Sequence, residues 1–257
     1  MSRLTDALGP PRDVTPVRAG IWRVEIDGRH LCAKVSEGVV DEAGGLDGLR
    51  AVTGAPSVPE VALVDADLLV TDWITEDGRT PSHEERLGRG LAALHGAPWP
   101  EWGGGSGWIG ACRVDNPTVA DGEAFYRGRM LELAGRCGLV EPVDRVACRL
   151  DRLLPPGGPA LVHGDLWWGN ILWGRDREPW LIDPSVHGGH PEEDLAMLAL
   201  FGAVPDQLLG AYAEIARLED GWQERVGLFQ LYPLLVHAVL FGGGYRSQAE
   251  ATARRYL

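Results

Sequence analysis

A short segment from His163 to Asn170, reading HGDLWWGN, carries side chains that could act on a phosphate group. A carboxylate can take the proton of a hydroxyl nucleophile, and amide and carboxylate oxygens are ligands that Mg²⁺ prefers. The order His-x-Asp-Leu-x-x-x-Asn is that of a phosphotransferase catalytic loop, in which the Asp is the base and the Asn binds metal. We therefore expect Asp165 to be a catalytic base, and Asn170 and Asp183 to hold Mg²⁺ beside ATP.

The alternative is that these residues only make turns, because Gly, Asp and Asn favour turns. The full spacing argues for chemistry, and so does a predicted hairpin of two short strands, 171–173 and 179–182. Its antiparallel strands should return Asp183 to the side of Asn170. A metal site on His163 is disfavoured, since no His-x-x-x-His spacing accompanies it.

Lys34 is the only lysine, since arginine supplies the rest of the 24 basic residues. It ends the second strand of a predicted hairpin, 21–26 and 30–35, which alternates apolar and polar residues around Asp-Gly. A kinase-like fold needs a lysine there to contact the α- and β-phosphates, paired with a glutamate on the next helix. Glu42, on a predicted helix 40–49, is the candidate. The alternative for Lys34 is an exposed residue at a strand end.

Gly20 lies where a loop covering the nucleotide is expected, just before the strand that begins at Ile21. Such loops are usually rich in glycine. This one reads Val17-Arg-Ala-Gly20 and has a single glycine. Gly20 is the candidate nucleotide-binding residue of this loop, and whether the loop backbone contacts the phosphates stays open.

The composition is that of a globular chain, with 257 residues, 45% hydrophobic and 24% charged. A net charge of −13 argues against nucleic-acid binding, because an acidic surface repels phosphate backbones. No apolar run is long enough to span a membrane, and the N-terminus lacks the apolar core of a signal peptide. The 4 cysteines show no paired spacing, so we expect reduced thiols and a cytoplasmic location.

The elements that must position these residues fall into two groups, which indicates an α+β fold. Residues 1–75 read as strands with one helix, and residues 76–257 as mostly helical. We expect the first to bind nucleotide and the second to carry the catalytic loop and bind the acceptor. A capping box of Ser82 and Glu85 predicts a helix through His95.

Further along, the glycines of 103–107 predict a flexible loop. Apolar periodicity predicts helices over 121–139 and 143–154, and again from residue 192 to the end.

The chain resembles the fructosamine kinase (ketosamine-3-kinase) family, a branch of the aminoglycoside-phosphotransferase-like and protein-kinase-like fold. The resemblance covers nearly the whole chain and is strongest over 160–245. It rests on the HGDLWWGN loop and on the following further matches: Leu181-Ile-Asp-Pro184, Glu192-Glu-Asp-Leu-Ala-Met197, Phe201-Gly202, Gln230-Leu-Tyr232, His237, Leu240-Phe-Gly242 and Tyr245.

This resemblance implies a bilobal protein-kinase-like fold, with a small β-rich N-lobe holding one main helix and a larger, mostly helical C-lobe. It implies ATP and Mg²⁺ as cofactors, and transfer of the γ-phosphoryl group to the 3-hydroxyl of a ketosamine. A ketosamine is a sugar joined to an amine by glycation, either a small molecule or a glycated protein amine. The implied outcome is deglycation, because the 3-phosphate adduct is unstable.

The resemblance also implies roles for matching residues around the phosphates. Asp165 would again be the base, with Asn170 and Asp183 as metal ligands. Lys34 would contact the nucleotide phosphates and would be steadied by Glu42.

Other matching residues would surround adenine and the acceptor. The strand over 68–74 would become the hinge against adenine, through Asp72, Trp73 and Ile74. Trp167 would line the sugar pocket, and His163, on the same loop, would also contact the substrate. Asp194 resembles a buried carboxylate that braces the catalytic loop from a helix N-terminal turn.

Two departures from the family pattern concern residues expected to border the acceptor pocket. Ser185-Val-His187 replaces an aromatic pair, and His190-Pro191 replaces a more polar pair. The acceptor therefore stays open between a ketosamine and another alcohol, such as an aminoglycoside, homoserine or choline. A non-catalytic ATP-binding scaffold is the alternative outside the enzymes, and the oligomeric state is left open.

Overall fold

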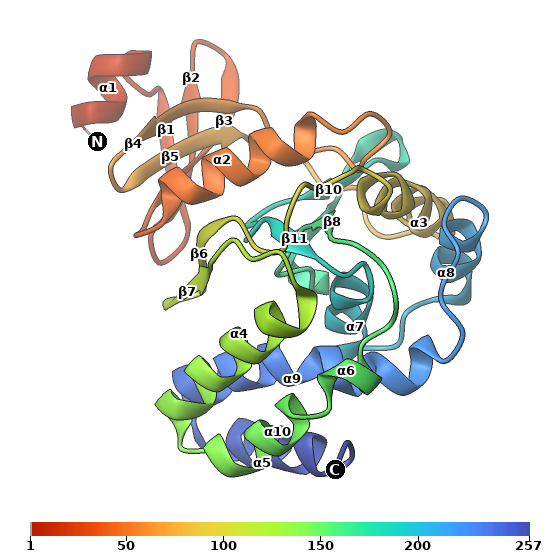
Figure 1. The fold of residues 1–257 in the computed structure, drawn as a ribbon. Coiled ribbons are helices and arrows are strands. Elements are labelled where there is room, and N and C mark those ends of the chain that lie inside the picture. Colours follow the sequence, from red (N-terminus) through yellow and green to blue (C-terminus); the bar gives the residue numbers. More distant parts are fainter. Residues whose placement is uncertain (1) are drawn as a thin grey trace.

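A five-stranded antiparallel sheet, in the order β1-β2-β3-β5-β4, forms one end of the computed structural model, which describes residues 2–257 (Figure 1). The predicted hairpin of β2 and β3 is confirmed, with Ile21 opposite Lys34 and Ile26 opposite Arg29. Its turn residues Asp27 and Gly28 have φ angles of 50° and 77°, as a two-residue hairpin turn requires. The strands span Asp13–Arg18, Ile21–Ile26, Arg29–Val35, Val61–Asp65 and Leu68–Asp72.

Helix α2 (Val39–Arg50) packs against β4 and β5 and confirms the helix predicted there (Figure 1). Apolar residues at helical spacing form its buried side, namely Val39, Ala43, Leu46 and Leu49. A short helix α1 (Ser2–Leu8) and strand β1 were not predicted. Every residue of β1 is exposed, so β1 has no alternating apolar pattern to reveal it.

The rest of the chain is mostly helical, as expected, and α4, α9 and α10 lie at the opposite end of the molecule from the sheet (Figure 1). Its main apolar core joins α4, α5, α9 and α10. The helices are α3 (Pro81–His95), α4 (Gly122–Cys137), α5 (Val140–Ala147), α6 (Leu150–Leu153), α7 (Glu192–Leu200), α8 (Asp206–Ala213), α9 (Trp222–Phe241) and α10 (Gly243–Arg254). The structure therefore confirms the α+β class.

Two short ladders lie between these ends and frame the HGDLWWGN loop. Strands β9 (Ile171–Trp173) and β10 (Pro179–Leu181) form the hairpin predicted from the sequence. Strand β8 (Ala160–Val162) pairs with β11 (His187–Gly189). The loop leaves β8 and enters β9, so both of its ends are held by strand pairing.

The start of α3 differs from the predicted capping box. Thr80, not Ser82, is the N-cap residue, and its side chain accepts a hydrogen bond from the amide of His83. Pro81 explains the shift, because proline is favoured at the first helical position and the cap must then precede it.

Two predicted segments between residues 103 and 154 also differ. Part of the expected loop forms β6 (Gly105–Ile109), which pairs with β7 (Cys112–Asn116). The predicted helix 121–139 ends at Cys137, because Gly138 adopts a left-handed φ of 71°. The predicted helix 143–154 is replaced by the two shorter helices α5 and α6.

The proposed division into residues 1–75 and 76–257 falls between the last strand of the sheet, which ends at Asp72, and α3. None of the helices in the described part of the chain is long and apolar enough to cross a membrane.

Candidate active site

Asp165 and Asn170 lie side by side in the HGDLWWGN loop. The amide nitrogen of Asn170 donates to the backbone oxygen of Asp165 at 2.9 Å and to its Oδ2 at 3.1 Å. Asp165 is 8% exposed, so most of its side chain is removed from water. Burial, and next the charge of Asp183, raise the pKa of Asp165 well above its usual range. Asp165 therefore holds a proton more strongly than an exposed Asp.

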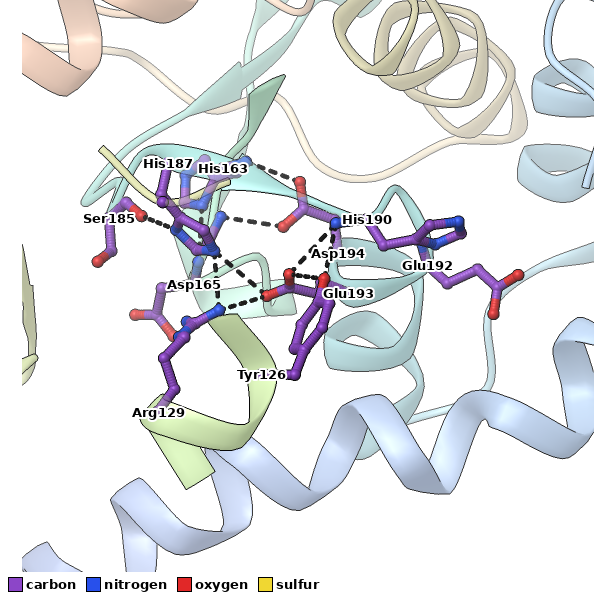
Figure 2. Close-up of polar contacts among 12 residues, drawn as sticks. Tyr126, Arg129, His163, Asp165, Ser185, His187, His190, Glu192, Glu193 and Asp194 are labelled. Atoms are coloured by element: carbon purple, nitrogen blue, oxygen red, sulfur yellow. Dashed lines mark hydrogen bonds and ion pairs between the residues drawn. The ribbon is translucent and has the colours of Figure 1, made fainter. Parts of the chain in front are cut away.

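Asp194 fastens the start of this loop to α7 (Figure 2). Its carboxylate accepts hydrogen bonds from the backbone amides of His163 at 2.8 Å and Gly164 at 3.0 Å. It also lies 3.1 Å from Nε2 of His95. A fully buried carboxylate with three donors is well satisfied, and burial is outweighed by these contacts, so the pKa of Asp194 is lowered.

His163 does not face the cleft, so the sequence-based expectation that it contacts the substrate is wrong. The side chain is fully buried, and its Nε2 lies 3.0 Å from the carbonyl of Ile182. Its Nδ1 accepts from the amide of Asp165, so Nε2 carries the hydrogen and donates to that carbonyl. His163 thus ties the loop to the segment before Asp183. The sequence pattern predicts that His163 lies on this loop, but it does not predict which way the His163 side chain faces.

Lys34 joins the sheet to the segment after β10. Its ammonium lies 2.6 Å from Glu42 Oε2 and 2.8 Å from Asp183 Oδ1. Burial lowers the pKa of Lys34, but the two carboxylates outweigh it and raise the pKa overall. Burial, followed by the charge of Asp183, raises the pKa of Glu42 to about 7. Lys34 therefore stays charged beside the carboxylate of Asp183, whose pKa it lowers against the effect of burial.

A cleft of about 590 Å³ brings the expected phosphate-site residues together. It is lined by Lys34, Glu42, Asp165, Asn170 and Asp183, and also by Gly20 and Trp167. This cleft is large enough for the phosphates of a nucleotide and a small acceptor to meet.

Gly20 lines the cleft in a tight turn beside β3. It has a φ of 76°, and a Cβ there would lie 2.9 Å from the carbonyl oxygen of Val35. Its own carbonyl accepts from the Val35 amide at 2.8 Å. Glycine is therefore needed at this position, because any side chain would collide with the backbone of β3.

The donor set beside the cleft fits Mg²⁺. The amide nitrogen of Asn170 is used by Asp165, so its Oδ1 is left to face a cation, and Asp183 offers carboxylate oxygens. Within residues 2–257, no cluster of three His, Cys, Asp or Glu side chains could hold a metal ion alone. Mg²⁺ typically takes one or two protein oxygens and completes its shell with phosphates and water.

A second cavity of about 290 Å³ shares Lys34, Glu42 and Asp183 with the lining of the first and contains the expected hinge. Asp72, Trp73 and Ile74 line it, together with apolar side chains such as Leu46 and Leu172. The amides of Asp72 and Trp73 donate to the carbonyls of Glu60 and His30. The amide of Ile74 has no such partner in the described chain, so it is free to bind the edge of a base.

Five aromatic rings form one side of the cleft and were not predicted as a group. We call this set the aromatic wall, and it comprises Trp167, Phe201, His237, Phe241 and Tyr245. Neighbouring rings lie with centroids 4.9 to 5.8 Å apart. Trp167, Phe201 and Phe241 are 37%, 41% and 66% exposed. Exposed rings in contact with one another favour binding an apolar or cationic group.

Only spacing along α9 and α10 hinted at this wall. His237, Phe241 and Tyr245 are four residues apart, as on one helical face, although Gly242 separates the two helices. Phe201 lies directly after α7, and nothing in the sequence shows that it meets them.

Ser185, His187 and His190 are not among the residues that line the cleft, contrary to expectation, and all three are buried. His187 Nδ1 lies 2.8 Å from the backbone oxygen of Ser185, and its Nε2 is 3.0 Å from an Arg129 nitrogen (Figure 2). Glu193 completes this group at 3.1 Å from Arg129. His187, Arg129 and Glu193 therefore hold the segment that follows Asp183 in place.

The hairpin β6–β7 closes the cleft from another side. Its Trp108 lines the cleft and lies directly against Gly38, the N-cap of α2, where no side chain would fit. The helix that carries Glu42 is therefore in contact with the β6–β7 hairpin.

Comparisons with known proteins point to one family. The model of the family described as fructosamine kinase matches residues 33–257. A protein from Synechocystis sp. named for a ketoamine kinase is 40% identical over 206 residues, which cover 74% of this chain and 67% of that protein. A protein-ribulosamine 3-kinase from Oryza sativa subsp. indica is 34% identical over 197 residues, covering 71% of this chain and 57% of its own length.

Solved structures agree with this. A crystal structure named for a fructosamine-3-kinase of Thermobifida fusca superposes with a TM-score of 0.90 at 39% identity, covering 99% of this chain and 97% of that one. An aminoglycoside phosphotransferase, APH(4)-Ia, has a TM-score of 0.67 at 15% identity, over 99% and 97% of the two chains. The second likeness shows the fold alone and supports the expected protein-kinase-like architecture.

Proposed function

The chain belongs to the fructosamine kinase family, and on that premise we propose that it transfers the γ-phosphoryl group of ATP to the 3-hydroxyl of a ketosamine. As a member of this family the chain is a phosphotransferase with an alcohol acceptor. The observation that carries the proposal is the convergence of Lys34, Asp165, Asn170 and Asp183 on one cleft.

Asp165 is the proposed base. The acceptor oxygen would bond to the γ-phosphorus, the bond from that phosphorus to the ADP oxygen would break, and the hydroxyl proton would pass to Asp165. The raised pKa of Asp165 suits it to accept this proton. Its backbone and side-chain contacts with Asn170 keep the carboxylate in one orientation.

Lys34, Asn170 and Asp183 are the proposed phosphate and metal residues. Bound Mg²⁺ would neutralise phosphate charge and keep the reacting oxygens in line. Asn170 Oδ1 and the Asp183 carboxylate would hold it, and the Lys34 ammonium, steadied by Glu42, would contact the α- and β-phosphates. Adenine would occupy the second cavity, where the Ile74 amide can donate to it.

The aromatic wall is the proposed site for the amine end of the acceptor. A ketosamine nitrogen is protonated near neutral pH, and a cation is attracted to the faces of aromatic rings. With the sugar beside Trp167 and its 3-hydroxyl at Asp165, the amine would extend toward Phe241, which is 66% exposed. That exposed end leaves room for a larger group on the amine, including a glycated protein side chain.

A cationic alcohol of the choline type is the second candidate. The same rings favour it, because quaternary ammonium groups bind well to aromatic faces. The wall alone therefore does not distinguish the two acceptors.

An acceptor panel tests the proposal. Purified protein with ATP and Mg²⁺ is given a synthetic ribulosamine, a fructosamine, choline or an aminoglycoside, and ADP release is measured. We expect release with the ketosamines, with phosphate on the 3-oxygen by ³¹P NMR, and release about 10²–10⁴-fold slower in Asp165→Asn. ADP release with choline alone would favour the second candidate. No acceptor-dependent release would overturn the proposal.

A further inference from the structure

Arg18 is aimed into the cleft by an irregularity in the sheet. It ends β1, and the pairing of β1 with β2 shifts between Pro16, which lies opposite Trp22, and Arg18, which lies opposite Ile21. Such bulges turn a side chain away from the direction that regular pairing would give it. As a result Arg18 lines both the cleft and the second cavity.

The guanidinium of Arg18 shares a carboxylate with Lys34. Its Nη2 lies 3.5 Å from Asp183 Oδ2, while Lys34 lies 2.8 Å from the other oxygen, Oδ1. The Arg18 contact is at the long limit for a hydrogen bond, and its side chain is 62% exposed. A long, exposed ion pair contributes little, so Arg18 can exchange this partner at low cost.

Nucleotide binding would change the surroundings of Arg18. If Asp183 ligates Mg²⁺, as proposed above, its oxygens turn to the metal and leave the guanidinium without its partner. A nucleoside triphosphate also carries more negative charge than one Mg²⁺ neutralises. Arg18 and Lys34 are the only arginine and lysine side chains that line the two cavities in the described chain.

The turn after Arg18 supplies few other donors. Gly20 is the only glycine in the turn, and its position against Val35 leaves it little freedom to fold over a phosphate. Kinases with a glycine-rich loop cover the terminal phosphates with that loop. A side chain is the remaining means of doing so here.

We propose that Arg18 binds the γ-phosphate of the nucleotide and replaces the contacts of a glycine-rich loop. The inference rests on the proposed function, and it adds a residue that neither the motif nor the family resemblance indicated. The planar guanidinium can donate two parallel hydrogen bonds to phosphate oxygens and is always charged. Lys34 serves the inner phosphates, so the two cations would hold different parts of the chain of phosphates.

Calorimetric titration with nucleotides tests this without any acceptor. Wild type, Arg18→Ala and Arg18→Lys are titrated with ATP, ADP and adenosine in Mg²⁺. We expect Arg18→Ala to weaken ATP binding at least about tenfold, ADP binding less, and adenosine binding not at all. Arg18→Lys should recover only part of the lost ATP affinity, since an ammonium lacks the planar pair of N–H donors of a guanidinium.

Arg12→Ala is the matched control, because Arg12 is an 85% exposed arginine of the same region that pairs only with Glu25. It removes the same charge, so an equal loss of ATP affinity would assign the effect to net charge and overturn the proposal. ATP affinity within twofold of wild type in Arg18→Ala would also overturn it, as would equal losses for ATP and ADP.

The two proposals fail in different ways. Wild type that binds ATP through Arg18 but phosphorylates no ketosamine would overturn the proposed acceptor and leave Arg18 as a phosphate-binding residue. If wild type and Arg18→Ala phosphorylate ketosamines equally well, the proposed role of Arg18 is overturned and the proposed acceptor stands. Wild type that does not bind ATP would overturn both.

Discussion

Lys34 Nζ lies 2.8 Å from Asp183 Oδ1, and this ion pair joins the sheet to the segment that follows β10. Both side chains are partly buried, at 20% and 26% exposure. The same lysine contacts Glu42 at 2.6 Å, so one ammonium binds two acidic side chains. The proposed nucleotide site therefore depends on charges from three separate segments of the chain.

Replacing Lys34 should impair both nucleotide binding and turnover. In Lys34→Ala the carboxylates of Glu42 and Asp183 would face each other without a cation, and the phosphates would lose a donor. We expect a KM for ATP raised about tenfold and a lower kcat, measured by steady-state kinetics. Arg145→Ala, which removes an exposed helix ion pair, should leave both constants unchanged. Unchanged kinetics in Lys34→Ala would show that this lysine is not part of the site.

Replacing Asp165 should stop transfer without preventing ATP binding. Asn keeps the shape of the side chain and its proximity to Asn170 but cannot accept the hydroxyl proton. We expect kcat to fall by about 10²–10⁴-fold, with an ATP dissociation constant close to that of wild type. Asp220→Asn, a change to a 96% exposed side chain, is the control. Wild-type kcat in Asp165→Asn would refute the proposed base.

Phe241 should contribute to acceptor binding. Phe241→Ala removes the most exposed ring of the aromatic wall, and we expect the KM for a ketosamine to rise several-fold while the KM for ATP is unchanged. The control is Ile215→Ala, which removes a 57% exposed side chain that lines neither cavity. An unchanged acceptor KM would place the amine elsewhere.

Asp194 should support both stability and catalysis. Asp194→Asn would replace one acceptor oxygen by a donor opposite the amides of His163 and Gly164. We expect a loss of about 2–3 kcal/mol in the free energy of unfolding, measured with urea. We also expect a lower kcat with little change in KM, because the loop that carries Asp165 would be less well placed. The exposed Asp144→Asn should change neither quantity.

His190 should make the protein less stable in acid. Burial lowers the pKa of His190 to about 4, against about 6.5 in the unfolded chain. Between these values the unfolded chain binds more protons, so stability falls as pH decreases from about 6.5 to 4. This residue would account for a loss on the order of 3 kcal/mol.

Comparing His190→Asn with wild type isolates that contribution. Asn can still accept from the amide of Glu192, as Nδ1 of His190 does at 3.2 Å. Thermal unfolding followed at pH 7, 6, 5 and 4 should show a shallower loss of Tm in His190→Asn. His30→Gln, at an exposed position, should follow the wild-type curve. Parallel curves for His190→Asn and wild type would contradict the assignment.

Local patterns were enough to predict the two hairpins and the meeting of the phosphate-site residues. Alternation and an Asp-Gly turn specify β2–β3, and antiparallel return in β9–β10 brings Asp183 near Asn170. The roles of these residues stay predictions, since their positions alone do not show chemistry.

What could not be predicted depends on contacts between distant segments. The aromatic wall needs α7, α9, α10 and the catalytic loop to meet, and no local pattern encodes that. Burial of His163 and His187 is decided by their partners Ile182 and Arg129, which are distant in sequence. The direction of the Arg18 side chain depends on a β-bulge, which the alternation of apolar and polar residues in the sequence does not reveal.

The β9–β10 hairpin also limits how this chain can change in length. Successive strand residues point to opposite faces, so deleting one residue within Ile171–Trp173 or Pro179–Leu181 would exchange inward for outward side chains. Asp183 would then be carried away from Lys34. Insertions at the exposed tip, Arg175–Arg177, would leave the pairing intact. The tip is therefore where a reporter peptide could be grafted without disturbing the nucleotide end of the enzyme.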